Sequence, residues 1–233
     1  MKLKYAKDEN GKDILTSEDG VHQVMMEWEK EYMQKCVQLL KPHGHVLEIG
    51  FGLGYSAAEI QKYPDVTSHT IIECSPVVWE KVYEFKKKHP KVILVKGRWQ
   101  DAMKKCGKFD SVFFDDYESN PYGFNRFTLF LELVLKNNTH IGSSIVTYDQ
   151  SKSNHLHYNC CKIQKSPFTA NIPDNCRYTK NTLHLTRITK IADWKYEEQH
   201  EQKKHQSRFI FPVMSAEETA RSYAAQKSSA PPQ

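Results

Sequence analysis

Apolar residues recur at three- and four-residue intervals in the first clearly patterned segment of the chain. They run from Val21 through Trp28 to Leu40, and this spacing predicts one amphipathic helix over residues 21–40. Polar residues 17–20 would cap its start, and residues 41–44, which include Pro42, would end it. We interpret the polar residues 1–20 as a separate N-terminal segment that acts as a lid over the main domain.

Short apolar runs alternate with helical patterns over the next hundred residues. Five of these runs predict buried strands, at residues 45–49, 70–73, 92–95, 111–115 and 144–148, and helical patterns begin near Tyr55, Pro76 and Phe127. Successive strand–helix units need crossover connections, so we expect a parallel sheet with helices on both faces. The predicted fold is α/β, of the doubly wound Rossmann-like type.

Two further apolar runs follow the fifth predicted strand. Residues 182–188 alternate apolar and polar side chains, and residues 208–212 form a second short run. We expect these runs to pair as a terminal antiparallel hairpin that completes a seven-stranded mixed sheet, within a main domain of residues 21–214. Residues 215–218 have the spacing of a capping box, so residues 215–233 are predicted to form a short helix and a flexible tail.

Composition narrows the class of protein. With 39% hydrophobic residues and only 10 Gly and 10 Pro among 233 residues, the chain can form a packed core. No segment approaches the roughly 20 apolar residues of a membrane span, and the N-terminus lacks an apolar signal region. The six cysteines form no C-x-x-C pair, so we expect reduced thiols in a cytoplasmic protein.

The pattern of charges and of potential metal ligands supports neither nucleic-acid binding nor a metal site. The 33 Lys and Arg against 28 Asp and Glu give a net charge of +5, but the lysines occur in short runs typical of solvated helix faces. Nucleic-acid binding is therefore not favoured. The group formed by His155, His157, Cys160 and Cys161 matches no zinc-ligand spacing, and no metal site is expected.

Three glycines follow the first predicted strand, at Gly50, Gly52 and Gly54. Such a loop lets the backbone approach a ligand closely, but the third glycine comes too early for the dinucleotide fingerprint. With the preceding Glu48, the run EIGFGLG resembles motif I of class I S-adenosylmethionine-dependent methyltransferases. Glu73 ends the second strand, where a carboxylate can accept hydrogen bonds from both ribose hydroxyls. The alternative is an ordinary strand-end acid.

The third and fourth strand ends carry further candidate groups. Trp99 and Gln100 follow the third strand, where they could supply an aromatic face and a polar contact for adenine, although Trp99 alone would be typical of a core residue. Asp115 ends the fourth strand, where a carboxylate can orient or deprotonate a nitrogen nucleophile. The Asn-Pro-Tyr sequence at residues 120–122 leaves a nucleic-acid base methyltransferase as an alternative.

Several separated segments together resemble guanidinoacetate N-methyltransferase and the related arginine N-methyltransferase family. These segments are VMMEWEKEYM at residues 24–33, VLEIGFG at 46–52, IIEC at 71–74, KGRW at 96–99 and DDY at 115–117. They occur in the family's order between about Val21 and Tyr148. The resemblance implies an S-adenosyl-L-methionine-dependent N-methyltransferase that acts on a small guanidino or amino compound, within a class I methyltransferase fold.

The resemblance also implies which residues form the site. Glu29 and Asp115 would hold the acceptor. Met25, Glu29 and Met33 are spaced by four, so they would lie in one row on the predicted helix, although Glu29 could also be a surface acid. Two carboxylates could bind a guanidinium and receive its proton. The cofactor site would comprise Met25, Met33, Gly50, Gly52, Gly54, Tyr55, Ser56, Ala57, Glu73, Cys74, Ser75, Trp99, Gln100 and Asp115.

Two departures from the family bear on the acceptor. The N-terminal segment lacks the family's tryptophan, for which Tyr5 could substitute. Asp149 begins the stretch where guanidinoacetate enzymes seat the substrate carboxylate, and an acid there would repel that group. We therefore expect an acceptor without this carboxylate. An arginine of a protein, a nucleic acid and a catalytically silent cofactor-binding relative remain as alternatives.

Overall fold

The structure is a computed structural model that describes residues 1–117, 126–149, 158–177 and 183–195. Met1–Trp194 form one compact unit. Several sequence-based predictions lie outside the described residues: the strand at 208–212, the C-terminal helix and tail at 215–233, and His155 and His157. Residues 120–122, which carried the base-methylating alternative, lie outside them as well.

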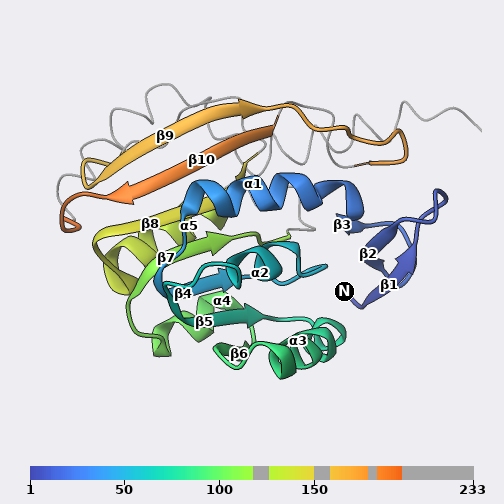
Figure 1. Ribbon diagram of the computed structural model, residues 1–233, viewed down its shortest axis with the longest axis horizontal. Helices are drawn as coiled ribbons and strands as arrows, with labels where there is room; N and C mark the ends of the chain where they lie inside the picture. Colours follow the sequence, from blue (N-terminus) through green and yellow to red (C-terminus); the bar gives the residue numbers. More distant parts are fainter. Residues whose placement is uncertain (118–125, 150–157, 178–182, 196–233) are drawn as a thin grey trace, which may run out of the picture. The chain divides into compact units, whose positions relative to one another are not determined.

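A seven-stranded mixed sheet forms the centre of the unit (Figure 1), in the order β6-β5-β4-β7-β8-β10-β9. The five strands from β6 to β8 are parallel, and β10 is antiparallel to both β8 and β9. The predicted fold class is therefore confirmed. The strands are β4 (Gly44–Ile49), β5 (Val66–Glu73), β6 (Val92–Lys96), β7 (Phe109–Phe114), β8 (Thr139–Asp149), β9 (Cys161–Phe168) and β10 (Leu183–Lys190).

The hairpin differs from the prediction in one of its strands. The strand expected at residues 182–188 is confirmed as β10, but its neighbours are β8 on one side and β9 on the other. Both edges of β10 are thus occupied, and the predicted pairing with residues 208–212 is wrong. Because β9 is an edge strand, it tolerates Pro167, a residue whose presence lowers the strand signal in the sequence.

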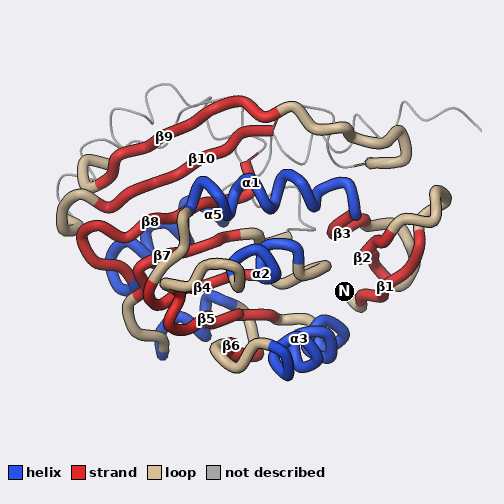
Figure 2. The backbone as a smooth tube through the Cα atoms, viewed as in Figure 1, coloured by secondary structure: helices blue, strands red, loops and turns tan. Residues whose placement is uncertain are grey.

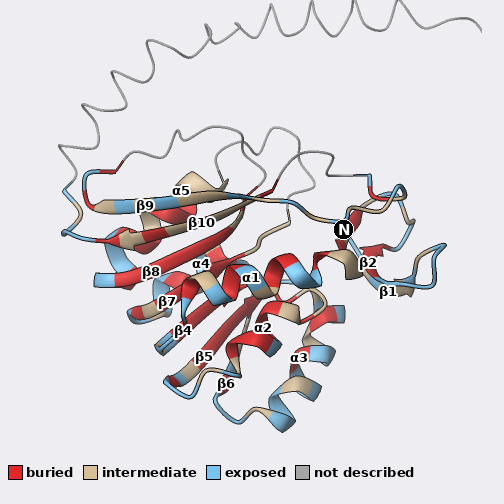
Figure 3. Cartoon of the chain, turned by 45° about the horizontal axis from the view of Figure 1, so that its top comes forward, coloured by how far each residue is buried: buried red, intermediate tan, exposed pale blue. Residues whose placement is uncertain are grey.

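Helices cover both faces of the sheet because its strands alternate apolar side chains between two core clusters. On β7, for example, Phe113 joins the cluster beneath α1–α3, and Phe114 joins the cluster beneath α4 and α5. Figure 3 shows the central strands as mostly buried. The helices are α1 (Lys30–Leu40), α2 (Tyr55–Ile60), α3 (Pro76–Lys88), α4 (Trp99–Ala102) and α5 (Arg126–Leu133), with short turns η2 (Met103–Lys105) and η3 (Val134–Asn138).

The N-terminal segment forms a second, three-stranded antiparallel sheet of β1 (Leu3–Lys7), β2 (Asp13–Ser17) and β3 (Gln23–Met26) (Figure 2). The prediction of one helix over residues 21–40 is therefore wrong for its first part. A 3-10 turn, η1 (Glu27–Glu29), follows β3, and α1 begins at Lys30. The apolar run at residues 24–26 fits the period of a helix and also that of a strand, and pairing with β2 selects the strand.

No helix in the described part of the chain has the length and apolar character of a membrane span. Among the same residues, no group of three or more His, Cys, Asp or Glu side chains is arranged to hold a metal ion.

Candidate cofactor and acceptor site

The glycine loop after β4 lies directly against the end of β7. Gly50 has φ +80°, and a Cβ atom at this position would overlap the backbone carbonyl of Asp115. The Gly50 N–H donates to the carbonyl of Ile72 at 2.9 Å, and the Asp115 N–H donates to that of Ile49 at 3.0 Å. The carboxyl ends of β4, β5 and β7 thus meet here, as expected for the ligand side of a doubly wound sheet.

Glu73 connects the end of β5 to the glycine loop. Its Oε2 accepts a 3.0 Å hydrogen bond from the Phe51 N–H, and its Oε1 accepts a 2.7 Å bond from the Ser75 N–H. Burial raises the pKa of this carboxyl, and the backbone N–H donors partly oppose that rise. Each carboxylate oxygen can accept more than one hydrogen bond, so Glu73 still has acceptor capacity for ribose hydroxyls.

Carboxylates gather around Asp115, which follows the last residue of β7. Burial raises the pKa of Asp115 well above its usual range, and the charges of four nearby carboxylates raise it further. We call this group the acidic centre. Such a site favours a cation, because a positive charge would relieve the repulsion. The acidic centre comprises Glu29, Glu48, Glu73, Asp115 and Asp116.

Two members of the acidic centre have cationic or imidazole partners within the protein. Asp116 forms an ion pair with Arg126 and accepts a 2.6 Å hydrogen bond from the indole N–H of Trp99. Glu48 lies 2.9 Å from the imidazole of His69, and both side chains are fully buried. By contrast, burial and neighbouring carboxylates, rather than any cation, dominate the environment of Asp115. The sequence did not point to Arg126 or His69 as partners.

The structure brings Met25, Glu29 and Met33 to three different elements, so their predicted single helical row is wrong. Met25 lies on β3, and its Sδ accepts a 3.1 Å hydrogen bond from the Leu53 N–H in the glycine loop. Glu29 is buried in η1, where its carboxylate accepts a 2.7 Å bond from the Met26 N–H. Met33 is buried on α1. Glu29 is therefore not a surface acid.

The remaining predicted cofactor residues lie along this same edge of the sheet. Trp99 is only 5% exposed and packs on Phe114 and Phe130, so the core interpretation holds for its indole ring. The Oε1 of Gln100 is shielded from solvent without a hydrogen-bond partner among the described residues. Other predicted members lie in the first turn of α2 (Tyr55, Ser56, Ala57) and between β5 and α3 (Cys74, Ser75). Their cofactor contacts stay predictions.

Asp149 does not present an uncompensated charge. Its Oδ2 lies 3.0 Å from the ammonium of Lys165 on β9 and accepts a 2.5 Å hydrogen bond from the hydroxyl of Thr186 on β10. The expected repulsion of an acceptor carboxylate rested on an unpaired acid, and that premise is wrong. The hairpin strand that the sequence did not reveal supplies the neutralising lysine.

Two contacts of the N-terminal segment reach the site; Tyr5 was a candidate for such a contact from the sequence, which gave no signal for His22. The phenol of Tyr5 donates a 2.8 Å hydrogen bond to the carbonyl of Gly52. The imidazole Nδ1 of His22 lies 3.3 Å from the phenol oxygen of Tyr117, two residues beyond Asp115. The N-terminal sheet thus contacts both the glycine loop and the loop that follows Asp115.

Comparison with known families decides the affiliation of the chain. The family described as guanidinoacetate N-methyltransferase matches residues 6–153. The chain belongs to this family. Membership in this methyltransferase family implies S-adenosylmethionine as the cofactor, as predicted from the glycine loop.

Curated relatives of this family member are fungal proteins named protein arginine N-methyltransferase 2. The protein from Candida glabrata is 36% identical over 122 residues, which cover 49% of this chain and 28% of the relative. The protein from Yarrowia lipolytica is 36% identical over 132 residues, which cover 51% and 26%. The matched region thus spans about a quarter of the length of these relatives.

Solved structures establish the fold of this guanidinoacetate N-methyltransferase family member independently of close sequence similarity. An O-methyltransferase from Bacillus cereus in complex with SAH has a TM-score of 0.51 at 14% identity, covering 72% of this chain and 82% of that one. TYW2 from M. jannaschii in complex with AdoMet has a TM-score of 0.52 at 15% identity, covering 81% and 85%. The fold is that of class I S-adenosylmethionine-dependent methyltransferases.

Proposed function

We propose that this protein transfers a methyl group from S-adenosylmethionine to a nitrogen of a guanidino or amino acceptor, which Glu29 and Asp115 bind. The observation that carries the proposal is the acidic centre, in which burial and four neighbouring carboxylates raise the pKa of Asp115. A site of this charge is suited to two cations, the sulfonium of the cofactor and the acceptor.

Features of the chain support binding of the cofactor at the carboxyl edge of the sheet. Gly50 and Gly52 let the glycine loop pack directly against Asp115 and Met25, with which a Cβ atom at either position would collide. Glu73 retains acceptor capacity for ribose. The shielded Oε1 of Gln100 is an acceptor without a donor among the described residues, which fits the exocyclic amine of adenine. These groups would hold the nucleoside.

The chemistry requires orientation and one proton acceptor. The cofactor, when bound, supplies an electrophilic methyl group on a sulfonium. Glu29 and Asp115 would orient the acceptor nitrogen for in-line attack, and alignment of this kind supplies much of a displacement's rate enhancement. The acceptor nitrogen must lose a proton, and Asp115 is suited to take it once the positive charges of the bound cofactor and acceptor favour its carboxylate form over the protonated form that burial favours in the protein without ligands.

The acceptor is proposed to carry a guanidino group. The names of the fungal relatives specify arginine, and the family name specifies guanidinoacetate. Since Asp149 is paired with Lys165, it provides no reason to exclude an acceptor with a carboxylate. No disulfide joins the described cysteines, which fits the reducing compartment expected from the sequence, such as the cytoplasm.

An assay of methyl transfer from labelled S-adenosylmethionine tests this function. The acceptors are guanidinoacetate, a guanidine compound without a carboxylate, and a peptide that contains arginine. We expect turnover of at least one acceptor, lost in Glu29→Gln and retained in Glu31→Gln, which alters an exposed acid of the same segment. Cofactor binding by calorimetry without turnover of any acceptor would instead support the catalytically silent alternative. Absence of cofactor binding would contradict the proposal as a whole.

A further inference from the structure

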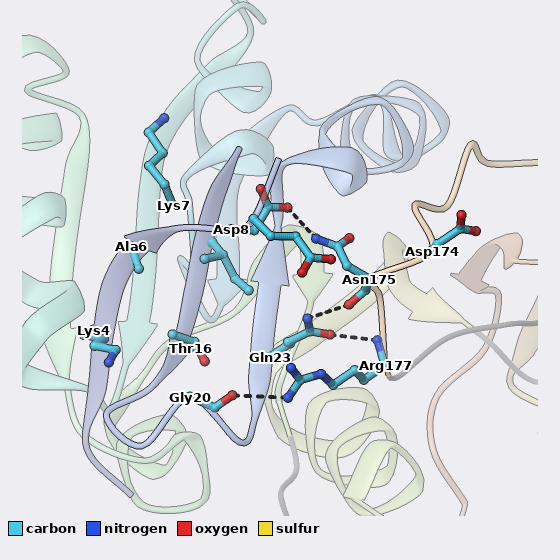
Figure 4. Close-up of a pocket in the computed structure, with 12 residues that line it drawn as sticks. Lys4, Ala6, Lys7, Asp8, Thr16, Gly20, Gln23, Asp174, Asn175 and Arg177 are labelled. Atoms are coloured by element: carbon cyan, nitrogen blue, oxygen red, sulfur yellow. Dashed lines mark hydrogen bonds between the residues drawn. The ribbon is translucent and has the colours of Figure 1, made fainter. Parts of the chain in front are cut away.

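A cavity separate from the acidic centre lies between the N-terminal sheet and residues 174–177, which follow β9 (Figure 4). Its volume is about 420 Å³, within the range of roughly 300–1,000 Å³ usual for ligand sites. Ala6, Ile14 and Thr16 line its floor. Because strand residues alternate between faces, their neighbours Tyr5 and Leu15 lie on the opposite side of the sheet, which packs on the main core.

Hydrogen bonds hold the walls of this cavity in place. The Asn175 Nδ2 donates to Asp8 at 3.0 Å, and the Gln23 Nε2 donates to the carbonyl of Asn175 at 2.8 Å. The Arg177 N–H in turn donates to the Gln23 Oε1 at 2.7 Å. Figure 4 shows the two bonds of Gln23 joining β3, and the bond of Asp8 joining the end of β1, to the segment at residues 174–177. The cavity is therefore bounded by ordered backbone and side chains from two separate parts of the chain.

The cationic side chains at the cavity already have acceptors. Lys7 pairs with Asp13 at 2.9 Å, the Lys4 ammonium donates to the carbonyl of Glu18 at 2.7 Å, and the Arg177 guanidinium donates to that of Gly20 at 3.4 Å. Lys7 is therefore paired with a carboxylate, and Lys4 and Arg177 each donate to a backbone carbonyl.

The groups that lack partners are acceptors. Within the described ranges, neither Glu9 nor Asp174 forms an ion pair or side-chain hydrogen bond, and the Asn175 Oδ1 is shielded from solvent without a partner. Glu9 and Asp174 are exposed carboxylates, whereas a shielded acceptor such as the Asn175 Oδ1 usually binds a donor. The cavity is therefore complementary to a group that carries a positive charge and several N–H donors.

The cavity lies close in the structure to the loop beyond Asp115. Gln23 lines it, and the adjacent His22 contacts Tyr117 at 3.3 Å. An extended polypeptide spans about 3.3–3.6 Å per residue, so the number of residues between two basic side chains of a peptide acceptor would report the separation of the two sites. A small guanidino compound has only one such group and could not occupy both sites.

We propose that this cavity binds a second basic side chain of a polypeptide acceptor whose methylated arginine occupies the acidic centre. This proposal rests on the proposed function and adds the substrate class: a polypeptide with two basic residues a few positions apart. The acceptors Glu9, Asp174 and Asn175 would bind the second side chain, and the hydrogen-bonded walls would set its distance from the reacting nitrogen.

The test compares a series of peptides with guanidinoacetate. Each peptide carries two arginines separated by one to four residues, and its partner has the second arginine replaced by glutamine. For the wild type we expect a lower KM for the best two-arginine peptide than for its partner. In Glu9→Gln/Asp174→Asn that preference should fall about fivefold, the scale for two partly exposed ion pairs, with kcat unchanged.

Two further variants make the result specific. Ala6→Arg places a guanidinium in the cavity and should abolish the preference for the second arginine, while guanidinoacetate kinetics stay unchanged. Asp65→Asn/Glu84→Gln removes the same charge from exposed acids outside the cavity lining and should leave the preference intact. Peptide binding by calorimetry, in the presence of S-adenosylhomocysteine, gives the same comparison without turnover.

The outcomes separate the two proposals. Turnover of guanidinoacetate with no preference for two-arginine peptides, or a preference that the cavity variants leave intact, would overturn the cavity assignment and leave the methyltransferase proposal standing. No cofactor binding and no turnover of any acceptor would overturn the methyltransferase proposal. In that case equal calorimetric affinities of wild type and cavity variants for the peptide would overturn the cavity assignment separately.

Discussion

The phenol of Tyr5 donates a 2.8 Å hydrogen bond to the carbonyl of Gly52, and this bond joins the first strand of the N-terminal sheet to the glycine loop. Burial and the nearby charge of Glu73 raise the pKa of Tyr5, so the phenol remains a donor throughout the neutral and mildly alkaline range. The glycine loop is thus held in part by a residue 47 positions away in the sequence.

Tyr5→Phe should therefore lower the affinity for the cofactor more than it lowers the free energy of unfolding. Loss of one hydrogen bond of this type costs about 0.5–1.5 kcal/mol, which corresponds to a rise in the Kd for S-adenosylmethionine of roughly two- to tenfold. Calorimetric titration measures the Kd. Lys2→Met, which alters an exposed side chain before the same strand, is the control. An unchanged Kd in Tyr5→Phe would show that the bond does not hold the loop in its binding form.

Glu73→Ala should weaken cofactor binding by about 1–3 kcal/mol, the scale for losing hydrogen bonds to a charged group. The exposed Glu80→Ala on α3 should have no effect. Because Glu73 also binds the N–H groups of Phe51 and Ser75, the far-UV spectrum and melting temperature of each variant must be compared. A folded Glu73→Ala protein with wild-type affinity would remove the ribose assignment.

Glu29→Gln and Asp115→Asn should each reduce turnover about a hundredfold or more, at the low end of general base catalysis. Both changes preserve shape and remove a charge that binds the acceptor and takes its proton. Initial-rate kinetics, with cofactor affinity measured in parallel, distinguish a loss in kcat from a loss in binding. Glu29→Gln also alters the acceptor of the Met26 N–H, so its stability must be measured. Near-normal turnover would assign Glu29 a purely structural role.

Asp115→Asn should also stabilise the protein without ligands at neutral pH. The pKa of Asp115 is raised in the folded state, so the folded protein holds a proton that the unfolded chain releases, and stability falls as pH rises above the unfolded-state pKa. Each unit of this shift amounts to about 1.4 kcal/mol. Denaturant unfolding of both proteins should give a difference at pH 7 that disappears near pH 3. Equal stabilities of the two proteins at both pH values would contradict a raised pKa of Asp115 in the folded protein.

Lys165→Met should destabilise the protein because it leaves Asp149 largely buried beside Thr186 without its cation. Removing one partner of a buried pair costs about 3–5 kcal/mol, and the residual exposure of this pair places the expected loss at or below the lower end. Lys165→Met/Asp149→Asn should recover much of the loss. Urea unfolding of the two single variants and the double variant completes the cycle, and purely additive effects would show that the pair is not coupled.

The sequence by itself determined the parallel core of the fold and much of the cofactor edge. Residues 45–49 and 111–115 are apolar runs too short for helices, so they predict buried strands. The glycine loop that follows the first of these strands marks the turn from that strand into a helix. These signals are local, and they fix the carboxyl edge of the sheet at which Glu73 and Asp115 both lie.

Only the tertiary structure decided which groups meet at that edge. Residues 24–26 fit a helix or a strand, and pairing with β2 selected the strand, which moved Met25 and Glu29 off the helix that carries Met33. Lys165 lies on the edge strand β9, whose sequence has only a weak strand signal, yet this lysine neutralises Asp149. Charge compensation depends on distances between residues far apart in the chain, and periodicity along the sequence carries no information about those distances.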